Sequence, residues 1–362
     1  MMETVAPLAG AARVSERGWR GFVLALALVL ASAVVALWPP ALGLVAAGVA
    51  LLVPLPEPLG VLSAGVAACA IAAWVGGGRT LMVLIWSALA LWSMLEPVPT
   101  GATADFDRLA RGWTLAAASG FGFAHLLAVG RRFISRALVA VGVATLVTVG
   151  AIAVRDVPIG RVVEVSQAAV GTRVGAILAR WRSHFSDPQW VRFATAQPDL
   201  AERAYEAGRA IERAVPTAAR LAPALAALET LLILGVAWSA FHRISRVRVG
   251  APLAVLARFR FNDQLIWGVV VGGVLALLPT FAEWQVMGTN LLLFFGALYG
   301  VRGGGVVAGW ASDRMVAIGA VVLLLAAGVI GAPAVLIGAA GTAVALGLSD
   351  TWRDWRGLSA PR

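Results

Sequence analysis

The chain contains the stretch Leu221-Ala-Pro-Ala-Leu-Ala-Ala-Leu-Glu-Thr-Leu-Leu-Ile-Leu-Gly-Val-Ala-Trp-Ser-Ala-Phe241, in which Glu229 is the single charged residue. About 20 apolar residues in a helix are enough to cross the roughly 30 Å hydrocarbon core of a bilayer. Apolar runs recur along the chain at Phe22–Trp38, Ala41–Val53, Leu59–Val75, Thr80–Leu95, Trp113–Val129, Ile134–Val154, Leu265–Phe281, Val286–Val301 and Val316–Leu348. The last run predicts two short helices or one helix kinked near Gly331-Ala332-Pro333. We therefore predict an all-α, polytopic transmembrane helical bundle of about 8–11 segments.

The composition agrees with this class and excludes several kinds of chemistry. Of 362 residues, 60% are hydrophobic and 13% are charged, whereas a soluble domain carries about 25% charged residues. All 29 basic residues are arginine, so a phosphate-binding loop lysine, a pyridoxal Schiff base and an S-x-x-K nucleophile are excluded. The lone Cys69 forms no intrachain disulfide, and His125, His184 and His242 have no metal-binding spacing. We expect no enzyme activity, no catalytic residues, no cofactor and no metal site.

The arginines also predict an orientation in the membrane. Arginine clusters lie at Arg131–Arg136, Arg243–Arg260, Arg302–Arg314 and Arg353–Arg356. Because such clusters gather in cytoplasmic loops, the net charge of +10 indicates the orientation of a multi-pass membrane protein rather than a nucleic-acid partner. The loop Glu96–Arg111 and the segment Arg155–Thr217 then lie outside. A cytoplasmic N-terminus requires that residues 22–53 cross the lipid bilayer an odd number of times.

This topology divides the chain into five parts. They are a cytoplasmic N-terminal tail (1–21), an N-terminal transmembrane bundle (22–154), an extramembrane amphipathic helical segment (155–218), a C-terminal transmembrane bundle (219–350) and a cytoplasmic tail (351–362).

Two apolar stripes at helical spacing run through the polar segment. The first stripe contains Val163, Val170, Val174, Ile177, Trp181 and Phe185, and the second contains Leu200, Ala204, Ala207, Ile211 and Val215. Two amphipathic helices, lying on the membrane surface or packed over the bundle, would produce both stripes. A solvated helical hairpin without a ligand is the alternative. Asp199 and Glu202 have the spacing of a capping box at the second helix.

Polar residues within the apolar runs are candidates for function because they are costly in lipid unless paired or facing a cavity. Glu229, with Thr230, would bind a cation or a positively charged substrate, or relay protons; alternatively it snorkels or pairs with a loop arginine. Asn290 would satisfy a helix start, form an interhelix hydrogen bond or contact a ligand. Glu229, Thr230 and Asn290 form the candidate ligand or ion site. A solvent-filled cavity lined by Glu229 and Asn290 would favour transport, and a tightly packed bundle would favour scaffolding.

Several other side chains have structural interpretations. We expect Asp263 to cap the helix that opens at Gln264, His125 to be interfacial or packed, and Arg302 to mark the cytoplasmic boundary. Tryptophans at the edges of apolar runs are expected in an aromatic belt; they are Trp19, Trp38, Trp113, Trp352 and Trp355.

Glycines at four-residue spacing give a second candidate surface. They are Gly268 and Gly272, then Gly296, Gly300 and Gly304, and finally Gly305 and Gly309. A helix face without side chains lets another helix approach closely within lipid. These glycines therefore predict helix packing inside the chain or a face for a partner subunit.

From Tyr205 onwards, six landmarks carry a resemblance to a known family. They are Tyr205-Glu-Ala-Gly-Arg209, Leu221-Ala-Pro-Ala-Leu225, Phe241-His-Arg-Ile-Ser-Arg246, Phe259-Arg-Phe-Asn-Asp-Gln-Leu-Ile-Trp267, Asn290-Leu-Leu-Leu-Phe-Phe-Gly-Ala-Leu-Tyr299 and Leu346-Gly-Leu-Ser-Asp-Thr-Trp-Arg-Asp-Trp355. The order and content of these motifs resemble the YybS-like family of bacterial membrane proteins, a domain of unknown function, although Asn262 stands where proline is commoner. That family is grouped with the S subunits of energy-coupling-factor transporters.

The resemblance implies a helical bundle that binds a small molecule from outside and docks onto an energy-coupling transmembrane subunit with two ATPases. ATP hydrolysis would have to come from those partners, because the chain has no lysine for a phosphate-binding loop. The first hypothesis is therefore small-molecule binding for uptake. The alternative is a membrane scaffold or assembly factor that acts through its extramembrane helices.

Overall fold

The computed structural model describes residues 41–97, 100–101, 103–127, 132–245, 247, 249–310 and 333–355. Within these residues every regular element is a helix, which confirms the all-α fold. The predicted N-terminal tail, the run Phe22–Trp38, the break at residues 331–332 and the last residues of the C-terminal tail lie outside the described part. The α-helices are α2 (Ala41–Leu52), α3 (Pro58–Val75), α4 (Thr80–Leu95), α5 (Ala104–Leu127), α6 (Phe133–Val154), α7 (Ile159–Ser183), α8 (Pro188–Ala196), α9 (Pro198–Arg220), α10 (Ala222–Ile244), α11 (Ile266–Leu277), α12 (Gln285–Trp310) and α14 (Pro333–Arg353). Short 3₁₀ turns lie at η1 (His184–Ser186), η2 (Leu256–Arg258), η3 (Asp263–Leu265) and η4 (Pro279–Trp284).

Five of the described helical stretches are long and apolar enough to span a membrane. They are Pro58–Val75, Phe133–Val154, Gly160–Ser186, Ala222–Ile244 and Pro279–Trp310. Shorter apolar helices lie at Gly43–Leu52, Thr80–Leu95 and Asp263–Leu277. The protein is therefore a multi-pass membrane protein.

Helix α5 differs from its sequence prediction at the N-terminal end. The apolar run predicts a helix from Trp113, but α5 begins at Ala104. Its first turn carries Asp105 and Asp107, whose negative charge suits the positive end of the helix dipole. The predicted outer loop Glu96–Arg111 is thus shorter, because its second half is helical.

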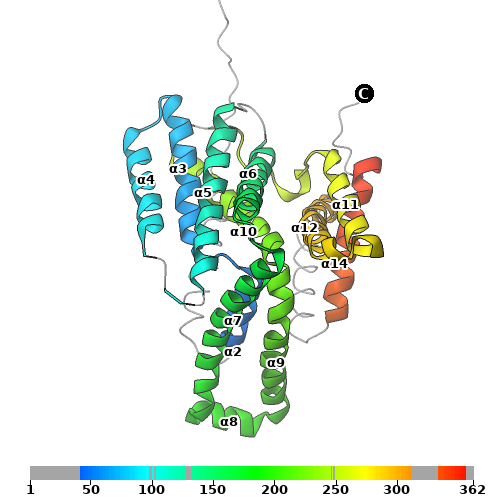
Figure 1. Ribbon diagram of the computed structural model, residues 1–362. Coiled ribbons are helices and arrows are strands. Elements are labelled where there is room, and N and C mark those ends of the chain that lie inside the picture. Colours follow the sequence, from blue (N-terminus) through cyan, green and yellow to red (C-terminus); the bar gives the residue numbers. More distant parts are fainter. Residues whose placement is uncertain are drawn as a thin grey trace, which may run out of the picture.

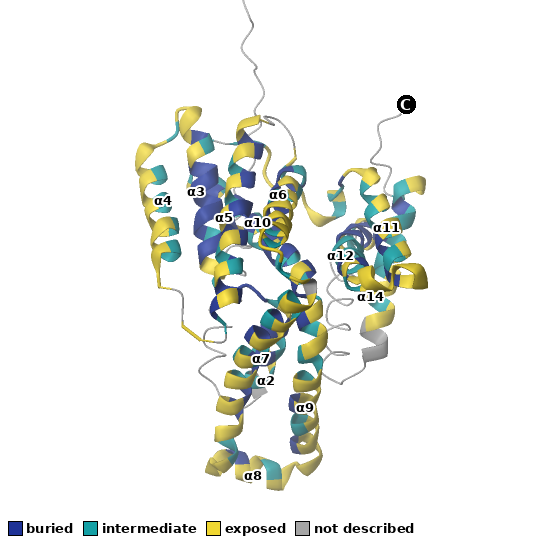
Figure 2. Cartoon of the chain, viewed as in Figure 1, coloured by how far each residue is buried: buried dark blue, intermediate teal, exposed yellow. Residues whose placement is uncertain are grey.

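The helices of the bundle form two groups (Figure 1). One group contains α3, α4, α5, α6 and α10, and the other contains α11, α12 and α14. Helix α10 joins them, because it packs against α3 and α6 in the first group and against α12 in the second. Figure 2 shows that buried residues concentrate on α3, whereas α4 has only exposed and intermediate residues and no buried one. Such an apolar, exposed helix suits the lipid-facing side of a bundle.

Helices α2, α7, α8 and α9 form a separate projection, which we call the lobe (Figure 1). Both predicted apolar stripes lie inside it. Val170, Val174, Leu178 and Trp181 of α7 are buried against α2, and residues of α9 pack onto the same cluster. The stripes therefore belong to two amphipathic helices, as predicted. Ala204, Ile211 and Val215 of the second stripe pack onto this cluster, whereas Leu200 and Ala207 are exposed. That the lobe lies outside the membrane stays a prediction.

The predicted capping box at the start of α9 is wrong. Gln197 is the residue that precedes the helix, which begins at Pro198, and no side chain caps this end. Asp199 lies within the first turn instead. Proline suits the first turn because its missing N–H is one that the helix leaves unpaired anyway.

The arginine clusters that lie in the described part meet at one end of the molecule. Arg136 at the start of α6 donates to the Val249 carbonyl at 2.8 Å. Arg260 pairs with Asp354 at 3.1 Å. The lobe projects from the opposite end of the first helix group (Figure 1). This arrangement agrees with the prediction that the clusters share one side of the membrane.

Candidate functional site

Glu229 lies in α10, and 7% of its surface is exposed. Its Oε2 accepts a hydrogen bond from the backbone N–H of Leu55 at 3.0 Å, and its Oε1 has no partner among the described residues. Leu55 stands between Pro54 and Pro56, which have no N–H of their own. The carboxylate thus satisfies the one N–H of this Pro-Leu-Pro turn, which links α2 to α3.

Arg173 of α7 holds the other side of the same turn. Its guanidinium donates to the carbonyls of Val53 and Pro54, each at 3.1 Å. The Pro54 carbonyl and the Leu55 N–H belong to one peptide group, so the Arg173 guanidinium binds its oxygen and the Glu229 carboxyl group binds its hydrogen. This arrangement, which we call the peptide clamp, ties the lobe helix α7 to the bundle helix α10. Glu229 therefore bonds to backbone and neither snorkels nor forms a direct ion pair.

Thr230, the next residue of α10, is fully buried. Its hydroxyl accepts a hydrogen bond from Trp113 Nε1 at 2.9 Å and donates to the Ala226 carbonyl at 2.7 Å. Trp113 is 8% exposed and lies in the core of the bundle. The prediction that Trp113 belongs to an aromatic belt is therefore wrong, because its indole N–H is used on a buried hydroxyl of α10.

Asn290 of α12 uses its whole side-chain amide inside the protein. Its Oδ1 accepts from the Ala224 N–H at 2.9 Å, and its Nδ2 donates to the carbonyls of Arg220 and Val286, each at 2.8 Å. The first two partners lie where α9 meets α10. The predicted interhelix hydrogen bond is confirmed, and it binds a helix end that would otherwise leave buried backbone groups unpaired.

The structure does not bring the three candidate residues to one cavity. The cavity beside the peptide clamp has a volume of about 180 Å³ and an almost wholly apolar lining that includes Leu55, Trp113 and Ala226. Neither Glu229 nor Asn290 lines it. Each of the three candidates instead connects segments that are distant in sequence, which is the behaviour expected of structural polar groups in a bundle.

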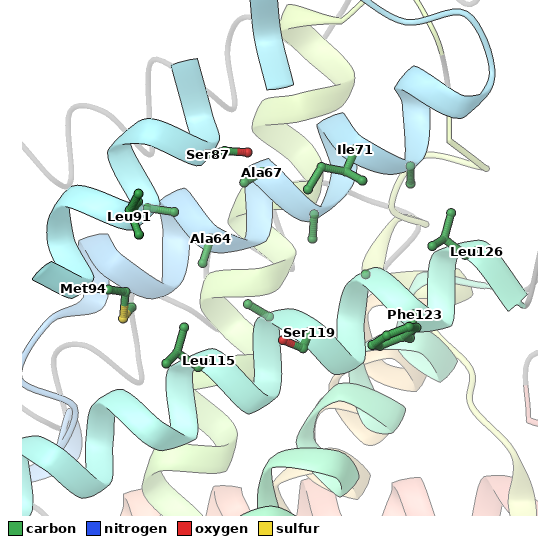
Figure 3. Close-up of a pocket in the computed structure, with 15 residues that line it drawn as sticks. Ala64, Ala67, Ile71, Ser87, Leu91, Met94, Leu115, Ser119, Phe123 and Leu126 are labelled. Carbon is green, nitrogen blue, oxygen red and sulfur yellow. The ribbon is translucent and has the colours of Figure 1, made fainter. Parts of the chain in front are cut away.

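A larger groove of about 440 Å³ opens between α4 and α5 over a floor formed by α3 (Figure 3). Most of its lining is alanine, leucine or another apolar residue, and Ser87 and Ser119 contribute hydroxyls from opposite walls. An open apolar groove on a membrane bundle is a surface for lipid or for another helix, and no charged side chain lines it.

The predicted glycine face is used in part for packing inside the chain. A Cβ at Gly268 would collide with the Phe295 ring, and one at Gly272 would lie 3.0 Å from the Leu292 nitrogen, so these two glycines bring α11 against α12. Gly300 lies beside Val344 of α14. Gly296 and Gly304 have no described atom near the Cβ position. Gly305 is buried and Gly309 is exposed.

The closest approach of two helices involves glycines outside the predicted set. A Cβ at Gly303 would collide with the Ala343 carbonyl, and one at Gly347 with the Tyr299 carbonyl. Helices α12 and α14 therefore meet backbone to backbone at Gly303 and Gly347. The run Gly303-Gly304-Gly305 indicates a close helix contact, but the spacing of glycines alone does not show which of the three faces α14.

Arg302 lies next to this contact, and none of its side chain is exposed. Its guanidinium pairs with Asp350 at 2.9 Å and with Asp263 at 2.6 Å, and it stands over the Phe261 ring at 5.5 Å. The capping prediction for Asp263 is wrong, because Asn262 accepts from the Gln264 N–H. Three of the motifs quoted above thus meet around Arg302. The first contributes Phe261 and Asp263, the second contributes Tyr299, and the third contributes Asp350.

His125 is packed, as the sequence predicts. It is 3% exposed, its Nδ1 lies 2.6 Å from the Phe121 carbonyl, and its ring contacts Trp238.

Comparison with known proteins gives no relative for this chain: no family model, no curated protein and no solved structure matches it. The resemblance to the YybS-like family therefore stays a prediction based on the quoted motifs.

Proposed function

We propose that this chain is a non-catalytic scaffold or assembly factor of the bacterial cytoplasmic membrane, which binds a partner protein through its lobe. One observation carries the proposal. The polar residues best placed to hold a ligand are hydrogen-bonded to other parts of the chain; they are Glu229, Thr230 and Asn290. A ligand that took the bonded atoms would have to break contacts between segments of the chain, and Glu229 Oε1 is the one side-chain oxygen of the three residues without a partner among the described residues. A bundle whose helices are connected by buried hydrogen bonds is suited to be a rigid support for an exposed lobe.

The lobe is the part with the chemistry of a protein-binding surface. Its exposed residues carry charges of both signs along α9, and an aromatic cluster near α8 is partly covered, with Trp190 buried and Phe193 exposed. Aromatic and arginine side chains are the residues that dominate binding energy in protein interfaces. The bundle helices, in contrast, expose mainly apolar side chains.

Site-specific photocrosslinking in living cells tests the proposal. Benzoylphenylalanine would replace Arg192 on α8 or Glu206 on α9, and in matched controls it would replace Leu91 or Trp92 on the exposed face of α4. We expect both lobe positions to give an adduct with the same protein and the α4 positions not to give it. Adducts that form equally from α4, or none from the lobe, would refute the scaffold function.

Small-molecule uptake with an energy-coupling subunit and ATPases is the second candidate. The observation in its favour is the apolar cavity of about 180 Å³ beside the peptide clamp, although ligand pockets are usually roughly 300–1,000 Å³. Purification in mild detergent distinguishes the two functions. Recovery of a coupling subunit with ATPases, and of a bound small molecule by mass spectrometry, would favour uptake over scaffolding.

A further inference from the structure

A hollow of about 280 Å³ lies on the lobe between α7 and α9. Its walls contain the rings of Trp181, Phe185 and Tyr205, and its lining includes the charged side chains of Arg182, Glu202 and Arg209. We call it the lobe hollow. It lies outside the peptide clamp and outside every candidate site that the sequence predicts.

The aromatic walls hold one another in place. Phe185 meets Trp181 edge to face at 4.6 Å between ring centroids and meets Tyr205 in the same way at 4.7 Å. The Tyr205 hydroxyl accepts a hydrogen bond from Trp190 Nε1 at 3.1 Å. A ring that enters such a hollow can stack or pack edge to face, and these contacts add to the gain from burying apolar area.

Trp181 is held between two helices of the lobe. Its Cδ1 atom lies against Gly43 of α2, and its Cζ3 and Cη2 atoms lie against Gly208 of α9. The six-membered ring of the indole is therefore the part that borders α9, and the residue is 3% exposed.

Gly208 is what allows α9 to approach the Trp181 ring. A Cβ at this position would lie 2.9 Å from Cζ3 of Trp181, which is closer than side chains normally approach. Tyr205, Gly208 and Arg209 stand at positions i, i+3 and i+4, so they share one face of α9. All three belong to the motif Tyr205-Glu-Ala-Gly-Arg209.

One arginine at the lobe hollow is available to pair with an acidic group. Arg182 is already paired with Glu212. Arg209 is exposed and forms no ion pair within the described residues, and Glu202 is the one acid in the lining. Because Glu212 neutralises Arg182, Arg209 and Glu202 are the remaining charges of the lining, and the Arg209 guanidinium offers planar, paired donors for a carboxylate.

The size indicates what kind of occupant fits. Sites for free small molecules are usually roughly 300–1,000 Å³ and enclose most of the ligand, whereas the lobe hollow is smaller and open to the surface. We propose that it receives an aromatic side chain of a partner protein, with a neighbouring carboxylate of that partner paired to Arg209. This inference rests on the proposed scaffold function and names the chemistry that its partner presents.

Binding of short peptides to the full-length protein in lipid nanodiscs tests the inference. The probe is acetyl-Gly-Trp-Asp-Gly-amide, and two controls replace its Asp by Lys or its Trp by Ala. By saturation-transfer NMR we expect the Trp-Asp peptide to bind about fivefold more tightly than the Trp-Lys peptide, as one exposed ion pair allows, and the Ala-Asp peptide not to bind. Equal binding of all three peptides, or of none, would overturn the inference.

Two variants place the binding in the lobe hollow. Arg209→Glu should reverse the preference between the Trp-Asp and Trp-Lys peptides, and Arg203→Glu, the same charge change elsewhere on exposed α9, should not. Gly208→Leu should abolish binding of both peptides by displacing Trp181. If Gly208→Leu disturbs folding, Arg209→Glu still decides, because its side chain is exposed; an unchanged preference in that variant would refute the site.

Free indole-3-propionate serves as the rival occupant. If it binds much more tightly than the Trp-Asp peptide, the lobe hollow is a site for a small aromatic acid and the partner-protein assignment fails. Failure of the inference is distinguishable from failure of the scaffold function. Lobe adducts that persist in Arg209→Glu and Gly208→Leu would keep the function and reject the site, whereas peptide binding without lobe adducts would do the opposite.

Discussion

Single polar side chains connect distant segments of this bundle, and Glu229 is one example. Glu229→Ala would leave the buried N–H of Leu55 without an acceptor, and an unsatisfied buried donor costs about 1–3 kcal/mol. Glu229→Gln keeps an oxygen for that N–H and removes the charge. We therefore expect a clear fall in the thermal unfolding midpoint in detergent for the alanine variant and a smaller fall for the glutamine variant.

The exposed acid Glu164 on α7 supplies the control, since Glu164→Ala should leave the midpoint nearly unchanged. A glutamine variant as unstable as the alanine variant would show that the charge of Glu229, rather than its bond to Leu55, is what the fold requires.

Arg302 and Asp350 give a second test at this scale, because neither side chain is exposed. Removing one partner of a buried ion pair leaves an uncompensated charge and costs about 3–5 kcal/mol. We expect Arg302→Leu and Asp350→Leu each to lower the unfolding midpoint strongly. The double variant should be more stable than either single variant, because Asp263, the other partner of Arg302, is half-exposed. A double variant less stable than both would contradict this account.

Sequence alone identified Glu229, Thr230 and Asn290, because polar residues stand out in apolar runs. It did not identify their partners. Leu55 lies 174 positions from Glu229 and Trp113 lies 117 positions from Thr230, and no local pattern records such contacts. No sequence pattern singled out Arg173, yet it completes the peptide clamp.

At the scale of helices, the contact between α12 and α14 predicts which glycines are essential. Gly303→Ala and Gly347→Ala would push a Cβ into a carbonyl of the facing helix, and overpacking of this kind costs about 1–3 kcal/mol. Gly296→Ala and Gly304→Ala add a methyl group where no described atom lies nearby. We expect the first pair to lower the unfolding midpoint and the second pair to leave it unchanged or slightly raised. Equal effects in both pairs would contradict the close approach.

Most helices could be predicted within a few residues, because apolar runs end at prolines, glycines or charges. The run Thr80–Leu95 matches α4 at both ends, and Ile134–Val154 differs from α6 by one residue. Helix α5 could not be bounded from hydropathy, since its first turns are charged and still helical. The sequence also did not predict that α2 packs against the apolar stripes of the lobe. An apolar stripe indicates that a helix face is covered, but it does not identify the helix that covers it.

On the scale of the whole molecule, two kinds of evidence converge on one arrangement. The arginine clusters predict a common side, and the described contacts of Arg136, Arg260 and Arg302 lie at one end of the bundle. The lobe projects from the other end (Figure 1). The lobe is nevertheless not a detachable module, because Arg173 of α7 and Glu229 of α10 bind the same turn before α3. Single substitutions on its surface are therefore better tests than its deletion.

Cysteine labelling decides the orientation of this arrangement. Cys69 is fully buried, so Cys69→Ala gives a background without a reactive thiol and with little change in packing. Into it we would introduce Gln189→Cys on α8 or Leu256→Cys in η2, two exposed positions at opposite ends that leave every arginine in place. Because arginine-rich loops stay in the cytoplasm, a membrane-impermeant maleimide should label residue 189 in intact cells and residue 256 only after permeabilisation. The reverse pattern would place the lobe in the cytoplasm, and its partner would then have to be sought on that side.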